Sequence, residues 1–183
     1  MNLNDALIRS SLLEKLRKRK PRAIIEELHV HNGNAIADIV ALESEAHCYE
    51  IKGSNDKIER IRNQGSYYNR VFRRITLVTT ENHLDKALNL TSPHWGIMLA
   101  SFSNEKVIIR HIRHCRVNPL FDKEKALRTL WKSEMLELLQ ESKHKSSSRE
   151  VLTQLIAESA KKVQLSVQIC AILIQRSQKF SNR

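Results

Sequence analysis

The chain has 183 residues, a length that suits one domain of ordinary size with an appendage. Only 4 glycines and 3 prolines, against 41% hydrophobic residues, exclude the collagen-like and intrinsically disordered classes. The formal net charge of +11 favours a polyanionic partner such as nucleic acid.

Helical and extended patterns alternate over the first 120 residues. Apolar residues at helical spacing predict helices, and short β-rich runs between turn residues predict strands. The first three strands predict an antiparallel meander, and the strand, helix, strand order that follows predicts a parallel crossover. The predicted elements are a helix at 4–19, strands at 23–31, 35–42 and 46–52, a helix at 56–72, a strand at 74–80, a helix at 83–90 and strands at 95–102 and 106–112.

The pattern is helical from Asp122 onward, with a polar break at 141–148 and an amphipathic helix predicted over 149–175. We therefore divide the chain into an α/β domain, 1–120, and a basic α-helical C-terminal extension, 121–183. The last helix carries more apolar surface than an exposed helix should. Packing on the core is the default interpretation, and a homodimer contact is the alternative.

The Asn32-Gly33 dipeptide predicts a tight hairpin between the first two strands, since glycine and asparagine tolerate positive φ. A two-residue turn there places Glu27 directly opposite Asp38 and leaves Glu26 on the other side of the sheet. Like charges that face each other across strands are destabilising unless a positive group lies between them. The sequence therefore predicts a cation, such as a divalent metal ion, between Glu27 and Asp38.

Glu50 and Lys52 share a face of the third strand, because side chains alternate along a strand. A two-residue loop at 44–45 would send both side chains to the wrong side of the sheet. A three-residue loop at 44–46 would instead pair Asp38 with Lys52 and gather the three carboxylates and the ammonium on one face. We expect this odd loop, or a bulge with the same effect.

These residues carry a family resemblance. Glu27 in the first strand, Asp38 in AIADIVAL, and Glu50 and Lys52 in CYEIK resemble the core of the PD-(D/E)XK nuclease superfamily. The segment from Gln64 to Tyr68, QGSYY, resembles the QxxxY pattern of its RecB-like and lambda-exonuclease-like branches. The likeness covers roughly residues 5–112. The whole chain is also similar to a family of small uncharacterised bacterial proteins assigned to that superfamily.

Two positions depart from the superfamily pattern. Ile36 stands where related sequences often have Arg or another polar residue, and Ala37-Asp38 replaces Pro-Asp. Neither departure removes a metal ligand. The resemblance implies a restriction-endonuclease-like core, which is a mixed sheet with an antiparallel three-strand meander and a parallel crossover strand.

The resemblance also implies a chemistry for each site residue. Hard oxygen ligands for Mg²⁺ or Mn²⁺ would come from the acidic side chains and one backbone carbonyl. An adjacent ammonium would neutralise charge on the phosphoryl group, and the QxxxY residues would orient water, the ammonium or a DNA phosphate. The implied metal ligands are Asp38, Glu50, the carbonyl of Ile51 and Glu27, and the implied catalytic residues are these three acids with Lys52, Gln64 and Tyr68.

Several of these residues have simpler interpretations. Tyr68 fits the apolar stripe of its helix and could be a core tyrosine, and Gln64 could be a solvated helix residue. Glu26 competes with Glu27, and His29 would lie on the Glu27 face without a fixed role. Five arginines around the QxxxY helix favour phosphate contact over a merely solvated face. They are Arg60, Arg62, Arg70, Arg73 and Arg74.

The sequence thus predicts a metal-dependent nuclease that acts on DNA, in repair, processing or defence. The alternative is a nuclease-fold module without activity that binds DNA or a protein. Three widely spaced cysteines and the lack of a secretory pattern favour the cytoplasm, and no apolar run is long enough for a membrane span. Trp95 and Trp131 are isolated and predict no stacking platform for bases.

Overall fold

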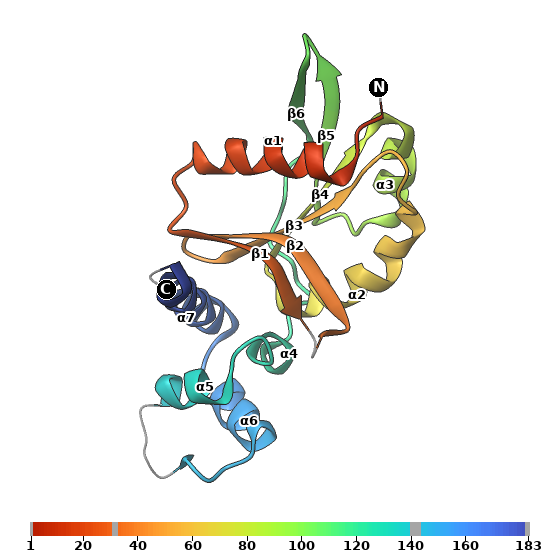
Figure 1. Cartoon of the computed structure of the whole chain (residues 1–183). Helices are drawn as coiled ribbons and strands as arrows, with labels where there is room; N and C mark the ends of the chain where they lie inside the picture. Colours follow the sequence, from red (N-terminus) through yellow and green to blue (C-terminus); the bar gives the residue numbers. More distant parts are fainter. Residues whose placement is uncertain (1, 31–32, 140–143, 182–183) are drawn as a thin grey trace.

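A single mixed sheet organises the computed structural model, which describes residues 2–30, 33–139 and 144–181 (Figure 1). The β1–β2, β2–β3 and β5–β6 pairs are antiparallel, and the β3–β4 and β4–β5 pairs are parallel. The predicted mixed α/β class, with a three-strand meander and a parallel crossover, is therefore confirmed. In spatial order the strands are β1 (Ala23–Val30), β2 (Ala35–Leu42), β3 (Ala46–Lys52), β4 (Arg74–Thr80), β5 (Gly96–Ser103) and β6 (Lys106–Arg113).

Helices cover both faces of this sheet (Figure 1). Helix α1 packs on one face with the cluster of Ile39, Tyr49 and Ile51. Helices α2, α4, α6 and α7 contribute to the core cluster of the other face. The helices are α1 (Asp5–Arg17), α2 (Ile61–Val71), α3 (Leu84–Leu90), α4 (Lys123–Leu127), α5 (Lys132–Leu139), α6 (Arg149–Ser159) and α7 (Lys162–Ser181), with 3-10 turns η2 (Ile58–Arg60) and η3 (Glu81–His83).

Local sequence explains where α1 begins and how it lies. The Asn4 side chain accepts a hydrogen bond from the Leu7 amide at 3.0 Å and so caps the helix. Ile8, Leu12 and Leu16 recur at helical spacing and are buried against the sheet. The N-terminal end of α1 is therefore held next to the end of β3, where the Ser54 amide donates to the carbonyl of Leu3 at 2.8 Å.

The C-terminal helices pack on the sheet, as the default interpretation expected. Leu165, Ile169 and Leu173 of α7 are buried in the same core cluster as the strand residues. The expectation of one helix over 149–175 is wrong, because Ala160 adopts an extended conformation (φ −119°, ψ 145°) and separates α6 from α7. Residues 141–143 of the predicted polar break lie outside the described residues.

The three cysteines, Cys48, Cys115 and Cys170, are free thiols. Among the described residues, no helix combines the length and apolarity that a membrane crossing requires.

Candidate active site

Asp38 lies where the backbones of β2 and β3 separate. The regular ladder between these strands ends at the pair Ile39 and Tyr49. Beyond it, one Asp38 carboxylate oxygen accepts a hydrogen bond from the Ile51 amide at 2.7 Å, so a side chain continues the contact between the strands. This arrangement fixes Asp38 next to the segment that carries Glu50.

The expected odd loop between β2 and β3 is present. Leu42 pairs with Ala46, which leaves a three-residue connection at 43–45. The predicted loop at 44–46 is wrong by one residue, but its parity is right. Because parity decides which face each side chain takes, Asp38 and Glu50 meet at the same end of the sheet.

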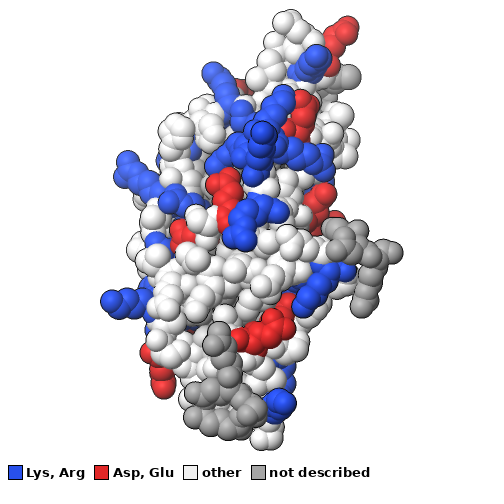
Figure 2. Space-filling view, turned by 90° about the vertical axis from the view of Figure 1, so that its left-hand side faces the viewer, with Lys and Arg blue, Asp and Glu red and all other residues white. Residues whose placement is uncertain are grey.

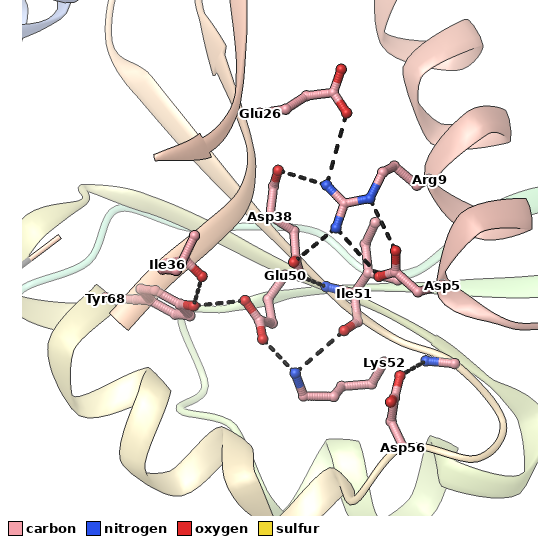
Figure 3. A network of polar contacts seen from close by, with 11 residues as sticks. Asp5, Arg9, Glu26, Ile36, Asp38, Glu50, Ile51, Lys52, Asp56 and Tyr68 are labelled. Atoms are coloured by element: carbon pink, nitrogen blue, oxygen red, sulfur yellow. Dashed lines mark hydrogen bonds and ion pairs between the residues drawn. The ribbon is translucent and has the colours of Figure 1, made fainter. Parts of the chain in front are cut away.

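Glu50, Lys52 and Tyr68 form a buried polar group beside Asp38 (Figure 3). The Lys52 ammonium pairs with one Glu50 carboxylate oxygen and lies 3.3 Å from the Ile51 carbonyl. The Tyr68 hydroxyl donates to the other Glu50 oxygen at 2.8 Å and lies 2.6 Å from the carbonyl of Ile36. Tyr68 of α2 is thus both a core residue and a direct partner of the predicted site.

Burial dominates the electrostatics of this group. The Glu50 side chain is only 1% exposed, and loss of solvation raises the pKa of its carboxyl to about 7, even though Lys52 opposes the shift. Burial and the nearby Glu50 charge also raise the pKa of the Tyr68 hydroxyl, which therefore stays a hydrogen-bond donor. A carboxyl that changes charge near neutral pH is suited to holding either a proton or a cation.

The cation next to Asp38 is the guanidinium of Arg9 from α1 (Figure 3). Arg9 donates to the Asp38 carboxylate and to the Asp38 carbonyl, each at 3.0 Å. It also pairs with Asp5 at 3.0 Å and lies 3.8 Å from a Glu26 oxygen. Arg9 is not among the site residues that the sequence predicts, because its position four residues after Asp5 in the first helix indicates only a local ion pair.

The expectation that Glu27 faces Asp38 is wrong. The register on both sides is the predicted one, with Leu28 opposite Ala37, but Glu27 and Asp38 are not a ladder pair. Glu27 has a positive φ of 55°, which breaks the regular pleat of β1 at this position. Glu26 is the acid of β1 that points toward Arg9 and Asp38, whereas Glu27 lines a cavity beside the C-terminal helices.

The turn that sets this register is described only in part. His31 and Asn32 lie outside the described residues. Gly33 has a φ of 88°, a value that glycine adopts without strain. His29 lines the same cavity as Glu27, so the structure does not bring it to Asp38.

The oxygen donors suit a hard cation, although they are already engaged. Both carboxylate oxygens of Asp38 and both of Glu50 accept hydrogen bonds from protein groups, which are Arg9, Ile51, Lys52 and Tyr68. Among the described residues, no group of three or more acidic, His or Cys side chains is placed to hold a metal ion. A divalent ion would therefore have two carboxylates and the Ile51 carbonyl as protein ligands, after Arg9 or Lys52 has moved aside.

The structure does not join Gln64 to this network. Its amide oxygen is buried and has no hydrogen-bond partner among the described residues. Gly65, the next residue, lies against the Trp95 ring, where an added Cβ would come within 3.2 Å of the ring. The glycine of the QGSYY segment thus lets α2 approach the core closely.

The five predicted phosphate-binding arginines do not form one surface. Arg60, Arg62 and Arg70 are exposed along the α2 region. Arg73 is ion-paired with Glu45 at 3.2 Å and its side chain is 11% exposed, so it acts in the fold. Arg73 and Arg74 also lie at the end of β4 opposite the Lys52 end of the sheet, because Arg74 pairs with His47.

A second basic surface lies at the end of α1. Figure 2 shows Lys and Arg side chains gathered on the upper part of the face that this helix end presents. This run follows the predicted 4–19 helix, and its density of charge is visible in the sequence. Its exposed cations are Arg17, Lys18, Arg19, Lys20 and Arg22.

Comparisons with known proteins point to a phage family. A family profile described as "Bacteriophage P4 protein cII" matches residues 2–183. A curated protein named "Protein cII" from Enterobacteria phage P4 is 26% identical over 140 residues, which are 75% of this chain and 53% of that protein. The chain thus spans about half the length of that relative. No solved structure matches the chain.

Proposed function

This chain belongs to the bacteriophage P4 protein cII family, and we propose that it is a metal-dependent nuclease that hydrolyses phosphodiester bonds in DNA. One observation carries the proposal: Asp38, Glu50 and Lys52 meet where β2 separates from β3. A helix, a three-strand meander, a second helix and a parallel strand hold these groups. We infer from this order that the core is restriction-endonuclease-like.

The proposed cofactor is Mg²⁺ or Mn²⁺, with Asp38, Glu50 and the Ile51 carbonyl as protein ligands. When bound, such an ion lowers the pKa of water and neutralises charge on a phosphoryl oxygen. The structural support is the oxygen character of the three donors and the buried carboxyl of Glu50, whose pKa is raised to about 7 by burial. Glu26 replaces Glu27 in the proposal as the third acid, since it faces the Asp38 cluster through Arg9.

The chain's own cations have separate tasks in this proposal. The Lys52 ammonium stabilises negative charge on the phosphoryl group, because it is held beside Glu50 at the site. The Tyr68 hydroxyl fixes the orientation of Glu50 at 2.8 Å. Arg9 holds Asp38 in place, and the Asp38 carboxylate would have to part from Arg9 in order to hold a metal ion. The Gln64 amide oxygen has no hydrogen-bond partner among the described residues, and it is proposed to orient water.

The proposed DNA surface has two parts. The exposed arginines of the α2 region, Arg60, Arg62 and Arg70, lie on the helix that supplies Tyr68. The basic run after α1, from Arg17 to Arg22, extends the positive field. Contacts of this kind bind phosphates without reading base sequence, and they weaken as salt increases.

A cleavage panel tests this function. Single-stranded, double-stranded and 5′-overhang DNA, with RNA for comparison, are incubated with Mg²⁺, Mn²⁺ or EDTA. We expect cleavage of DNA that depends on the metal and falls by roughly 100-fold or more in Glu50→Gln. Glu59→Gln is the matched control, because Glu59 pairs with Lys86 on the surface and should leave the rate unchanged.

A second candidate function is a binding module with a nuclease fold and no activity. The observation that favours it is the Arg9 guanidinium, which already neutralises Asp38. In that case no substrate form would be cleaved with any metal, while DNA binding would persist in Glu50→Gln. Metal-dependent cleavage that Glu50→Gln abolishes would exclude the module.

A further inference from the structure

A large cavity lies between β1 and the C-terminal helices, apart from the site formed by Asp38, Glu50 and Lys52. Its volume is about 620 Å³, within the range of roughly 300–1,000 Å³ that small-molecule sites occupy. Apolar residues of β1, including Ile25 and Leu28, line one side, and the C-terminal helices line the other. Glu27 belongs to this cavity, and its strained φ of 55° lies at the cavity wall.

Two arginines with incompletely bonded guanidinium groups line this cavity. Arg128 and Arg149 line it, and the Nε of each is buried with no hydrogen-bond partner among the described residues. Arg149 is fixed, because its Nη2 donates to the carbonyls of Arg128 at 2.6 Å and Leu130 at 2.8 Å. A fixed guanidinium beside a second, incompletely bonded one forms a site for an anion such as phosphate, which arginine can bind in bidentate fashion.

The third arginine of the cavity has a different role. Arg176 is ion-paired with Glu134. Its guanidinium also lies 4.4 Å from the centre of the Trp131 ring. It therefore holds one side of an aromatic wall and adds little free charge. Glu27 is the acidic residue among those that line the cavity.

Two aromatic rings from distant parts of the chain meet at this wall. Trp131 and Phe180 lie edge to face, with ring centres 6.1 Å apart, and both line the cavity. They are 51% and 57% exposed, although large rings are usually buried. The expectation that Trp131 is isolated is therefore wrong, because Phe180 joins it only after α7 has packed. Exposed rings beside cationic groups are typical of sites that stack nucleic-acid bases.

We propose that this cavity binds a nucleotide. The phosphate lies between Arg128 and Arg149, the base lies against Trp131 and Phe180, and the Glu27 carboxylate accepts a hydrogen bond from an amino group or a hydroxyl. The chemistry requires an anion joined to a planar aromatic ring, since a phosphate alone would leave the ring wall uncovered. The ligand is either a free mononucleotide or the terminal nucleotide of a single strand.

This assignment does not depend on the proposed nuclease activity. Glu26 and Glu27 are consecutive residues, yet Glu26 points to Arg9 and Glu27 lines the cavity. The residues that line the cavity are different from those that bond Asp38 and Glu50, so each site can be tested while the other is inactive. Binding in EDTA keeps the cavity measurable whether or not the protein cleaves DNA.

Tryptophan fluorescence of the full chain tests the proposal in EDTA. Trp131 is 51% exposed in the cavity wall and Trp95 is 1% exposed in the core, so quenching on titration reports the cavity. The ligands are AMP, ribose 5-phosphate and a 5′-phosphorylated single-stranded hexanucleotide. We expect saturable quenching by AMP and binding of ribose 5-phosphate at least about tenfold weaker, because it lacks the base.

Two charge-matched variants decide whether the cavity is responsible. Arg128→Gln should weaken AMP by roughly tenfold or more, measured by calorimetry. Arg110→Gln removes the same charge from exposed β6 and should leave the affinity unchanged. Arg128→Lys keeps the charge but loses the planar fork, so it should bind with intermediate affinity and provides a test if Arg128→Gln fails to fold.

The outcomes separate the two ligand sources. A hexanucleotide that binds at least about tenfold tighter than AMP, with Arg128→Gln weakening both, identifies a strand end. Equal affinities identify a free nucleotide. The proposal is overturned if Arg128→Gln and Arg110→Gln bind AMP and the hexanucleotide equally well, or if neither ligand quenches Trp131 at millimolar concentration.

Discussion

The site around Asp38 and Glu50 and the cavity beside β1 carry polar groups in opposite states. At the first, both carboxylate oxygens of Asp38 and of Glu50 have donors from the chain itself. In the second, the buried Nε atoms of Arg128 and Arg149 have no partner among the described residues. All four carboxylate oxygens of Asp38 and Glu50, the acidic cluster, are thus hydrogen-bonded within the chain. The cavity lined by Arg128 and Arg149 instead has hydrogen-bond donors without acceptors among the described residues.

This difference bears on what each site needs in order to function. A satisfied network keeps its geometry without a ligand, but any ligand must displace a protein group such as Arg9. Unsatisfied buried donors gain a hydrogen bond when an anion arrives and lose none. We therefore expect ligands to exchange with protein contacts at the acidic cluster and to fill unmet contacts in the cavity.

The largest effect should come from Asp38→Asn on DNA cleavage. We expect a loss of roughly 1,000-fold, because the change removes a charged metal ligand and weakens the bond to Arg9. Arg128→Gln should leave the cleavage of a saturating substrate unchanged. Initial rates of DNA cleavage in Mg²⁺ measure both variants. Equal losses of rate in the two would show that the site around Asp38 and the cavity do not differ in function.

Lys52→Met should be the most destabilising change at the site around Asp38 and Glu50. It leaves Glu50 buried without its cation, at a cost of roughly 3–5 kcal/mol. Because burial raises the folded-state pKa of Glu50 to about 7 from 4.5, its ionisation opposes folding increasingly as pH rises through that interval. Lys52 lowers the pKa of Glu50, so its removal raises that pKa further. The loss of stability with rising pH should therefore continue to higher pH in Lys52→Met.

Urea unfolding at about pH 5.5 and about pH 8.5 measures this pH dependence. The destabilisation by Lys52→Met should be larger at the higher pH. Lys86→Met is the control, since Lys86 is paired with Glu59 on the surface with 62% of its side chain exposed. A surface pair contributes about 0–1 kcal/mol. A cost of Lys52→Met that did not change with pH would show that Glu50 is not the group left behind.

Gly53→Ala, next to this site, should have a smaller effect. A Cβ at Gly53 would lie 2.9 Å from the Leu3 carbonyl oxygen and 3.1 Å from the Asp5 nitrogen. The start of α1 would have to shift, at a cost of roughly 1–3 kcal/mol, and Arg9 would shift with it. Thermal unfolding measures the cost, and Ser54→Ala, which removes a single hydrogen bond to Leu3, is the milder control.

Glu27→Gly should have the smallest effect, and it should be stabilising. Glycine adopts the φ of 55° without strain, which relieves roughly 1 kcal/mol. Cleavage should be unchanged, since Glu27 lies away from Asp38. Glu26→Gln is the paired variant and should lower cleavage if Glu26 is the third acid. A loss of cleavage in Glu27→Gly alone would restore the sequence-based assignment of that residue.

Much of the fold could be predicted from the sequence because its signals are local. The β4 strand, at Arg74–Thr80, was predicted with its observed bounds, since it is a short apolar run between polar segments. The break between α6 and α7 was missed because Ala160 and Lys161 are ordinary helix formers. Tertiary packing, which sequence periodicity does not report, decides the conformation there.

The candidate site was predictable only where side chains alternate regularly between the two faces along a strand. Asp38, Glu50 and Lys52 follow from strand parity and the odd loop, and the structure brings them together. Glu27 was assigned by the same rule and failed, because one positive φ changes the direction of the side chains around it. Arg9 could not be found this way, since it reaches Asp38 from another element and depends on how α1 docks.

The three-residue connection at 43–45 also limits which insertions and deletions the β2–β3 hairpin tolerates. Inserting or deleting one residue there would turn β2 over relative to β3, exchanging its inward and outward side chains and parting Asp38 from Glu50. A change of two residues would restore both. Among natural variants of this hairpin, length differences should therefore come in pairs wherever the acidic cluster is retained.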